Sequence, residues 1–145
     1  MAMRKKHLNP MMALSYKSKP LKVKRGVGQY FHEENDKITL DCINNVSHIG
    51  HCHPEYVCRM ERQLETLLTN SRFIYDGLME ATHKLLKKLP PQLSVVTFVN
   101  SGSEANDKAL QMAEIHSKKS GIICMDGAYH GITKSCLDIS PYKWN

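Results

Sequence analysis

Serine, glycine and glutamate residues between Val99 and Asn106 have the types and spacing of an anion-binding helix start. The run reads Val-Asn-Ser-Gly-Ser-Glu-Ala-Asn. Ser101 and Glu104 have the spacing of a capping box, in which the two side chains satisfy unpaired N–H groups of a first helical turn. Gly102 lets a ligand approach the backbone, and free N–H groups beside hydroxyl groups suit a phosphate. An ordinary cap without a ligand has the same pattern, so both interpretations stay open.

This run joins a strand-like segment to a helix-like segment. Residues 94–99 are apolar and β-branched, as in a strand buried on both faces of a parallel sheet. We expect a helix over 104–119 and a second buried strand over 121–125. Units of this order predict a right-handed crossover and a parallel α/β sheet. Ligands of such sheets lie at the carboxyl ends of the strands, where Ser101 and Gly102 fall.

The second expected strand ends in Asp-Gly-Ala-Tyr-His-Gly, residues 126–131. Because neighbouring parallel strands end at the same edge of a sheet, we expect Tyr129 to lie near Gly102. A phosphate-holding helix start beside an aromatic ring suits a flat, phosphorylated cofactor. Taken alone, Tyr129 is more typical of a half-buried loop aromatic than of a stacking platform, and the pairing of both strand ends is what favours stacking. The sequence contains neither G-x-x-x-x-G-K-[ST] nor G-x-G-x-x-G, which argues against two common nucleotide sites.

Histidine and cysteine residues crowd together between residues 48 and 53, and these are the ligand types of zinc. His51, Cys52 and His53 are adjacent, however, and adjacent residues cannot easily all reach one tetrahedral ion. No second ligand pair follows at a suitable spacing. We therefore predict no metal site, and instead a tight loop at Gly50 that leads into a helix beginning at Pro54.

Hydrophobic periodicity predicts two further helices, over 54–68 and 77–88, whose apolar stripes are expected to pack in a core. Residues 27–32 and 37–42 look like hairpin strands around a polar turn. The residues before them are expected to be extended or irregular. These elements divide the chain into a basic arm (1–26), a hairpin, loop and helix segment (27–73) and the beginning of a larger domain (74–145).

The net charge of +6 is concentrated in the N-terminal arm. Residues 1–32 contain eight Lys or Arg and no acid, whereas the rest of the chain contains 12 Lys or Arg and all 14 Asp or Glu. Aromatic residues are not interleaved with this charge, so we expect no nucleic-acid partner. No apolar run is long enough to cross a bilayer, so we expect no membrane partner. The five cysteines include no C-x-x-C pair, which favours reduced thiols in an intracellular compartment.

Three motifs together resemble the class III aminotransferases, which use pyridoxal 5′-phosphate (PLP). The motifs are Asn100–Asn106, Gly-His-Cys-His-Pro at 50–54 and Ala-Tyr-His-Gly at 128–131. The ethanolamine-phosphate and 5-phosphohydroxylysine phospho-lyases are the more similar branch, through residues 4–7, 40–46, 69–73 and 139–142. The resemblance implies the N-terminal part of a fold-type I PLP-dependent transferase, with a β-hairpin arm and an incomplete, mainly parallel sheet with flanking helices. The domain beginning at residue 74 would then be the PLP-binding large domain.

Roles for particular residues follow from this resemblance. The implied cofactor-binding residues are Ser101, Gly102, Ser103, Tyr129 and His130, with the phosphate at the first three and the pyridine ring against Tyr129. The implied substrate-binding residues are Asn44, Asn45, Asn70, Ser71 and Arg72. A guanidinium fork suits a substrate phosphate, which makes the arginine its expected ligand. The implied reaction uses PLP to expel phosphate from a small phosphorylated amine or amino acid, ethanolamine phosphate or 5-phosphohydroxylysine.

No lysine in this chain has the context of the family's Schiff-base lysine, so no catalytic residue is assigned and that lysine is expected downstream of Asn145. We therefore expect a fragment that is inactive by itself. Two alternatives stay open: a non-catalytic remnant that associates with a full-length paralogue, and an ordinary class III aminotransferase. The family resemblance also implies a homodimer, or a dimer with that paralogue. It suggests mitochondria, which the acid-free arm supports weakly, with the cytoplasm as the alternative.

Overall fold

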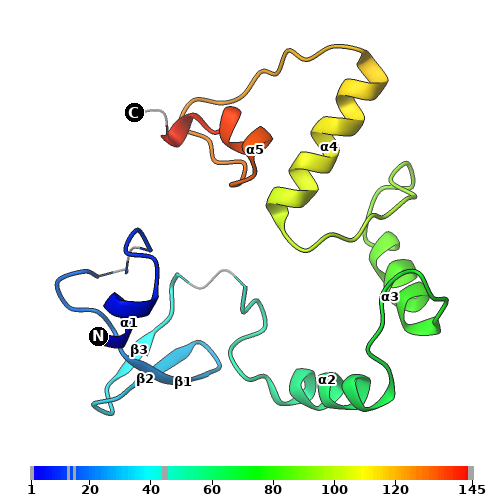
Figure 1. Ribbon diagram of the computed structural model, residues 1–145. Coiled ribbons are helices and arrows are strands. Elements are labelled where there is room, and N and C mark those ends of the chain that lie inside the picture. The colour runs from blue at the N-terminus through cyan, green and yellow to red at the C-terminus, as the bar shows by residue number, and fades with distance from the viewer. Residues whose placement is uncertain (1, 13, 15, 44–45, 144–145) are drawn as a thin grey trace. The chain divides into compact units, whose positions relative to one another are not determined.

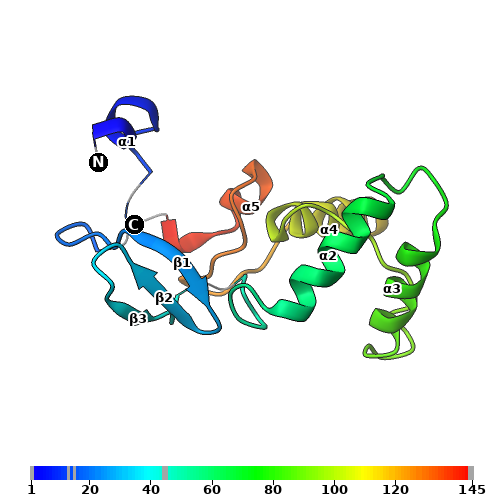
Figure 2. The same ribbon diagram turned by 90° about the horizontal axis from the view of Figure 1, so that it is seen from below.

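The computed structural model describes residues 2–12, 14, 16–43 and 46–143. The chain separates into two compact units, Met1–Phe73 (unit 1) and Ile74–Asn145 (unit 2). Among the described residues, unit 1 contains a three-stranded sheet and the helices α1 and α2 (Figure 1). Unit 2 contains the helices α3, α4 and α5 and a short 3-10 turn, η1 (Figure 2).

The sheet of unit 1 is antiparallel, with the order β1-β2-β3. Its strands are β1 (Val23–Val27), β2 (Tyr30–Glu33) and β3 (Ile38–Leu40). Val27 pairs with Tyr30 across a turn in which Gly28 has a φ of 55°, a left-handed conformation that glycine adopts without strain. The predicted hairpin is confirmed at β2 and β3, with the polar turn between them.

The arm is more regular than the sequence predicts. It contains the helix α1 (Ala2–His7), where the expectation of an extended or irregular segment is wrong, and the strand β1, which is extended but was not predicted as a strand over these residues. β1 includes Lys24, Arg25 and Gly26, which have low intrinsic strand propensity. The pairing with β2 overrides that propensity, and pairing between strands is not visible in the local sequence.

The predicted helices after the loop are confirmed as α2 (Pro54–Thr66) and α3 (Asp76–Leu86). Pro54 is the first residue of α2, where its missing N–H costs nothing. On α2 the Arg59 guanidinium donates to Glu55 and holds the pKa of that carboxyl below its usual value. The prediction that the apolar stripes pack in a core is wrong, because neither helix contains a buried residue. Within unit 1 no other described helix or strand packs against α2, and within unit 2 none packs against α3.

The two predicted parallel strands are also absent from the described residues. Residues 93–99 and 119–125 form neither helix nor strand. Val95 is 86% exposed and Ile123 is 102% exposed, although both were expected to be buried. A strand buried on both faces needs paired neighbours and covering helices, and the described chain supplies neither here. Of the predicted strand–helix–strand unit, the described structure therefore contains the helix but neither parallel strand.

Helix α4 (Gly102–Ser117) is the helix expected between those segments, and it packs against α5 (Lys134–Asp138). Helix α5 in turn contacts η1 (Pro141–Lys143). The buried residues of the described part of unit 2 all lie between 131 and 141, namely Gly131, Cys136, Ser140 and Pro141. Water is therefore excluded chiefly where the segment after residue 126 folds back near the start of α4.

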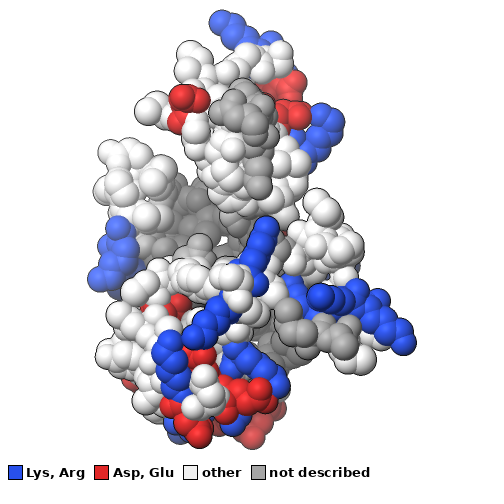
Figure 3. Space-filling model, turned by 90° about the vertical axis from the view of Figure 1, so that its left-hand side faces the viewer, with Lys and Arg blue, Asp and Glu red and all other residues white. Residues whose placement is uncertain are grey.

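Basic side chains lie among acidic ones on the face of the molecule that Figure 3 shows. Glu34, for example, pairs with Lys22 at 2.5 Å, and this ion pair lowers the pKa of the glutamate carboxyl. On α5, Lys134 pairs with Asp138 at 2.7 Å, which raises the pKa of the lysine. None of the described helices combines the length and the apolar character that crossing a membrane would require.

Candidate functional site

The start of α4 has the cap that the sequence predicts, with one difference. Ser101 is the N-cap residue, and its Oγ accepts a hydrogen bond from the N–H of Glu104 at 3.1 Å. The Glu104 carboxylate accepts from the backbone N–H of Asn100 at 2.8 Å and from the Asn100 side chain at 3.1 Å. In a standard capping box it would accept from the N-cap residue itself. The loop is thus fixed one residue earlier than expected.

Gly102 and Ser103 are the first two residues of α4, so helix geometry provides no carbonyl partner for their N–H groups. A Cβ added to Gly102 would meet nothing within 4 Å, which leaves room for a ligand against the backbone. The Ser103 Oγ accepts a hydrogen bond from the N–H of Ile132 at 3.1 Å. Its hydroxyl proton remains available for an acceptor such as a phosphate oxygen.

The loop that carries Tyr129 and His130 lies against this helix start. The Asn106 side chain donates to the carbonyl of His130 at 2.7 Å. Gly131 packs on Ser103 so closely that an added Cβ would lie 2.6 Å from its Oγ. The sequence prediction that these two segments lie together therefore agrees with the structure, although the parallel strands invoked for it are absent.

Two groups in this loop are suited to contact a bound molecule. Tyr129 is 55% exposed, so part of its surface is open to a bound molecule. The Nε2 atom of His130 is buried and has no hydrogen-bond partner among the described residues. A buried polar atom without a partner is costly, and a ligand atom or water can supply the missing bond. The region therefore combines helix N–H groups and serine hydroxyls, which suit a phosphate, with an aromatic ring and the His130 nitrogen. This combination fits PLP.

The predicted substrate residues lie in unit 1 where the structure describes them. Asn70, Ser71 and Arg72 form a turn after α2. The Asn70 Oδ1 accepts from the Arg72 backbone N–H at 3.0 Å and from its Nε at 3.2 Å, which orients the guanidinium. Asn44 and Asn45 lie outside the described residues.

The loop at 41–51 is closed by His51. The His51 Nε2 lies 2.7 Å from the Asp41 Oδ2, and the two side chains are 13% and 5% exposed. Its Nδ1 lies 3.2 Å from the Ser47 hydroxyl, and its backbone exchanges two hydrogen bonds with Gly28. Because an ionised carboxylate only accepts, Nε2 carries the proton. The tight loop at Gly50, which has a φ of 90°, is confirmed.

Metal binding finds no support in this geometry. Both ring nitrogens of His51 already face protein partners. Across the described ranges of the chain, no group of three or more His, Cys, Asp or Glu side chains is placed to hold a metal ion. His51 therefore holds the loop together through Asp41, Ser47 and Gly28.

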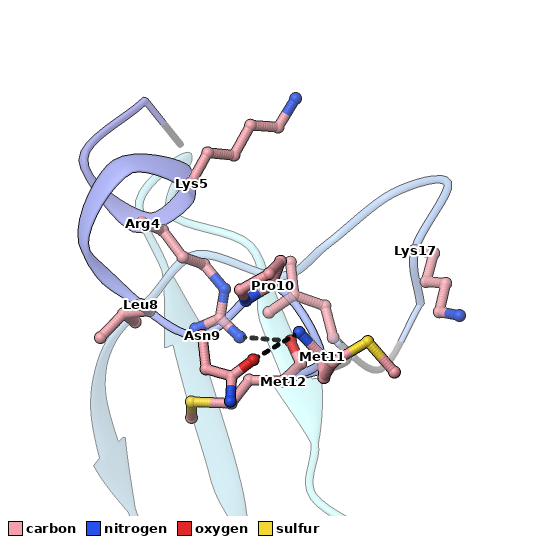
Figure 4. A pocket seen from close by; sticks show the side chains of 9 residues that line it. Arg4, Lys5, Leu8, Asn9, Pro10, Met11, Met12 and Lys17 are labelled. Carbon is pink, nitrogen blue, oxygen red and sulfur yellow. Dashed lines mark hydrogen bonds between the residues drawn. The ribbon is translucent and has the colours of Figure 1, made fainter.

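A hollow of about 640 Å³ in the arm lies among residues that were not predicted as a site (Figure 4). The Arg4 guanidinium closes it by donating to the carbonyl of Met12 at 3.0 Å, and the Asn9 side chain accepts from the N–H of Met11 at 2.9 Å. Met11 is 85% exposed, so the wall of the hollow is itself open to solvent. Its lining includes none of the phosphate-binding, stacking or histidine groups described above.

Sequence reasoning missed the contribution of residues 133–143 to the site. Contacts from this segment reach both Ser103 and His130. The available signal was the resemblance of residues 139–142 to the phospho-lyase branch, which gave no role to Ser140 or Tyr142. The buried position of Ser140 depends on tertiary packing and has no local pattern.

Residues 11–143 match the family described as aminotransferase class III. The chain is 48% identical to a Drosophila melanogaster protein named alanine–glyoxylate aminotransferase 2-like, over 99% of this chain and 29% of that protein. It is 39% identical to ethanolamine-phosphate phospho-lyase homolog 1 of Caenorhabditis elegans, over 98% of this chain and 30% of that protein. It is 35% identical to the human mitochondrial alanine–glyoxylate aminotransferase 2, over 96% and 28%. The chain thus spans less than a third of the length of these relatives.

A solved structure of a phospholyase from Arthrobacter in complex with phosphoethanolamine is similar in three dimensions. The TM-score is 0.92 and the sequence identity 34%, over 97% of this chain and 33% of that chain. The similarity therefore extends through both units and includes the helix start and the loop described above.

Proposed function

The chain belongs to the class III aminotransferase family, and from this membership we propose that it is the N-terminal, cofactor-binding part of a PLP-dependent phospho-lyase. The observation that carries the proposal is the contact between the start of α4 and the loop at 128–131. That contact places free N–H groups, hydroxyl groups and an exposed aromatic ring in one small region. The names of the nematode and Arthrobacter relatives support phospho-lyase chemistry.

In this proposal each group of the site has a distinct task. The N–H groups of Gly102 and Ser103 and the Ser103 hydroxyl hold the cofactor phosphate, which the dipole of α4 also favours. The Tyr129 ring stacks on the pyridine ring. His130 supplies its unpartnered nitrogen beside that ring. When bound, PLP supplies an electron sink, which stabilises the negative charge left when a bond to the carbon that carries the substrate amine breaks.

Replacing Gly102 with alanine tests the phosphate site. The new methyl group meets no protein atom within 4 Å, and alanine favours a helix over glycine, so α4 should be unharmed. The methyl group would occupy the space through which the phosphate reaches the backbone. We expect the Kd for pyridoxine 5′-phosphate, measured by calorimetry, to rise about tenfold, equivalent to about 1.4 kcal/mol. This probe has the ring and phosphate of PLP but no aldehyde to react with lysines.

Gly121→Ala is the matched control, since Gly121 also faces open space and lies outside the site. It should bind as the unmodified chain does. The phosphate site would be refuted if Gly102→Ala and the unmodified chain bound equally well, or if pyridoxine without a phosphate bound as tightly as its phosphate ester.

Arg72 is the proposed ligand of the substrate phosphate, because Asn70 already orients its guanidinium. We expect Arg72→Ala to weaken phosphoethanolamine binding about tenfold, since a charge-assisted hydrogen bond contributes about 1.5 kcal/mol or more. Chemical-shift titration with phosphoethanolamine and with ethanolamine would measure this. Arg59→Ala, on the exposed face of α2, is the control and should change neither titration. An equal loss for both ligands would show that Arg72 does not read the phosphate.

An ordinary class III aminotransferase is the second candidate, and the name of the Drosophila relative favours it. The same titration distinguishes the two candidates. A phospho-lyase site should prefer phosphoethanolamine to alanine, whereas an aminotransferase site should show the opposite preference.

Association with another chain is a further part of the proposal. Apolar side chains on α2 are exposed in the described structure, including Val57, Met60 and Leu64. A second copy or a full-length paralogue would cover such a stripe, and copurification with either would test this. We also propose a mitochondrial location, for which the name of the human relative is the support.

A further inference from the structure

The segment after the Tyr129–His130 loop folds back and supports it from behind. The Ser140 Oγ accepts a hydrogen bond from the N–H of His130 at 2.9 Å and donates to the carbonyl of Cys136. Ser140 and Cys136 are both fully buried. The Cys136 thiol donates to the carbonyl of Ser103 at 3.4 Å, which links the segment to the start of α4. One buried serine thus ties the loop to α5.

Tyr142 extends this support to the ring of Tyr129. Its N–H donates to the carbonyl of Ala128 at 3.4 Å. Its ring meets the Tyr129 ring edge to face, with centroids 5.1 Å apart and an angle of 83° between the planes. This is a favoured geometry of aromatic pairs, in which the positive edge of one ring faces the negative face of the other. The contact restricts the rotation of the Tyr129 side chain.

The Tyr129 side chain is exposed to solvent although its ring contacts Tyr142. Tyr129 is 55% exposed and Tyr142 is 41% exposed, whereas Ser140 and Pro141, which precede Tyr142, are buried. A side chain that contacts a neighbouring ring, lies on a backbone anchored by the buried Ser140 and stays open to solvent is oriented before any ligand arrives. Such preorganisation raises affinity, because less rotational freedom is lost on binding.

We propose that Tyr142 is a positioning residue that orients Tyr129 for stacking against the cofactor ring, with Ser140 anchoring the backbone of the same loop. The proposal rests on the proposed function, because it assigns the Tyr129 ring to PLP. The phosphate contacts at the start of α4 involve neither tyrosine ring. Tyr142 therefore affects recognition of the ring and leaves recognition of the phosphate unchanged.

Two ligands separate these effects: pyridoxine 5′-phosphate, which has a ring, and inorganic phosphate, which has none. Tyr142→Ala should raise the Kd for pyridoxine 5′-phosphate about fivefold and leave that for inorganic phosphate within about twofold, as expected when one aromatic pair is lost. Tyr142→Phe keeps the ring edge and should bind like the unmodified chain. Tyr56→Ala replaces another exposed tyrosine, on α2 in unit 1, and as the control should change neither affinity.

A double-mutant cycle completes the test. If Tyr142 acts through Tyr129, then Tyr129→Ala combined with Tyr142→Ala should bind no more weakly than Tyr129→Ala alone. Additive losses, an equal weakening for both ligands, or unchanged binding in Tyr142→Ala would overturn the positioning role while leaving the PLP site intact. If the unmodified chain binds inorganic phosphate as tightly as pyridoxine 5′-phosphate, the proposed function fails, and the role of Tyr142 fails with it.

Discussion

Replacing Gly131 with alanine is expected to reduce binding of pyridoxine 5′-phosphate about 100-fold, because the loop can no longer pack on α4. Gly131 has a φ of 130°, which side-chain-bearing residues rarely adopt. An added Cβ would also lie 2.6 Å from the Ser103 Oγ and 2.9 Å from the Ser103 Cα. Strain and overlap together should cost about 3 kcal/mol of local stability. Calorimetry and amide hydrogen exchange of residues 127–132 would measure the two effects.

Gly127→Ala separates the strain from the overlap. Gly127 lies in the same loop with a φ of 65°, but an added Cβ there meets nothing within 4 Å. Only backbone strain applies, and it should cost about 1 kcal/mol. If the Gly131 variant binds the ligand no more weakly than the Gly127 variant, the close packing on Ser103 does not hold the site together.

His51→Ala is expected to destabilise unit 1 by about 3 kcal/mol, because it removes a hydrogen bond from the buried Asp41 carboxylate together with a packed ring. The substitution removes the His51 donor from Asp41, whose side chain is 5% exposed and whose Oδ1 also accepts from the N–H of Ile43 at 3.0 Å. It also removes the ring that packs on Phe31, with centroids 4.7 Å apart, and on Gly26. The free energy of unfolding of unit 1, obtained from amide hydrogen exchange in the sheet, is the quantity to measure. Exchange at Gly28, which pairs with His51, should accelerate most.

His48→Ala is a close control for this effect. His48 belongs to the same loop and is exposed, so its removal should change the stability by less than about 0.5 kcal/mol. Equal exchange rates in the two variants would show that the pair between Asp41 and His51 does not hold the loop.

The predicted fold class, the N-terminal part of a fold-type I PLP-dependent transferase, is confirmed by the family match and the similar solved structure. The helices α2, α3 and α4 were predicted to within about two residues, because their signals are local: Pro54 begins α2 and Ser101 caps α4. The short helices α1 and α5 were not predicted. Strands were predicted less well. Residues 94–99 have the composition of a buried strand, but a strand also needs a partner, and its presence cannot be read from the segment itself.

In the candidate site, too, some residues could be predicted from the local sequence and others depend on tertiary packing. The cap pattern placed Ser101, Gly102 and Ser103 at a helix start, which is a local property. The proximity of Tyr129 followed from a topological rule that holds for the family fold, although its strands are absent from the described chain. Ser140 and Tyr142 could not be assigned, because their contacts depend on how residues 133–143 pack. A buried serine and an exposed one look identical in a sequence.

Because Cys136 is buried, the rate at which its thiol is alkylated would report whether the surrounding structure is folded. Cys42, Cys52 and Cys58 are exposed, Cys124 is intermediate and Cys136 is inaccessible. An alkylating reagent should therefore modify the first three thiols rapidly, whereas Cys136 reacts only during openings that detach α5 from α4. Mass spectrometry of the alkylated peptides would thus report whether any variant still has an intact support behind the Tyr129 loop, without a ligand or an activity assay.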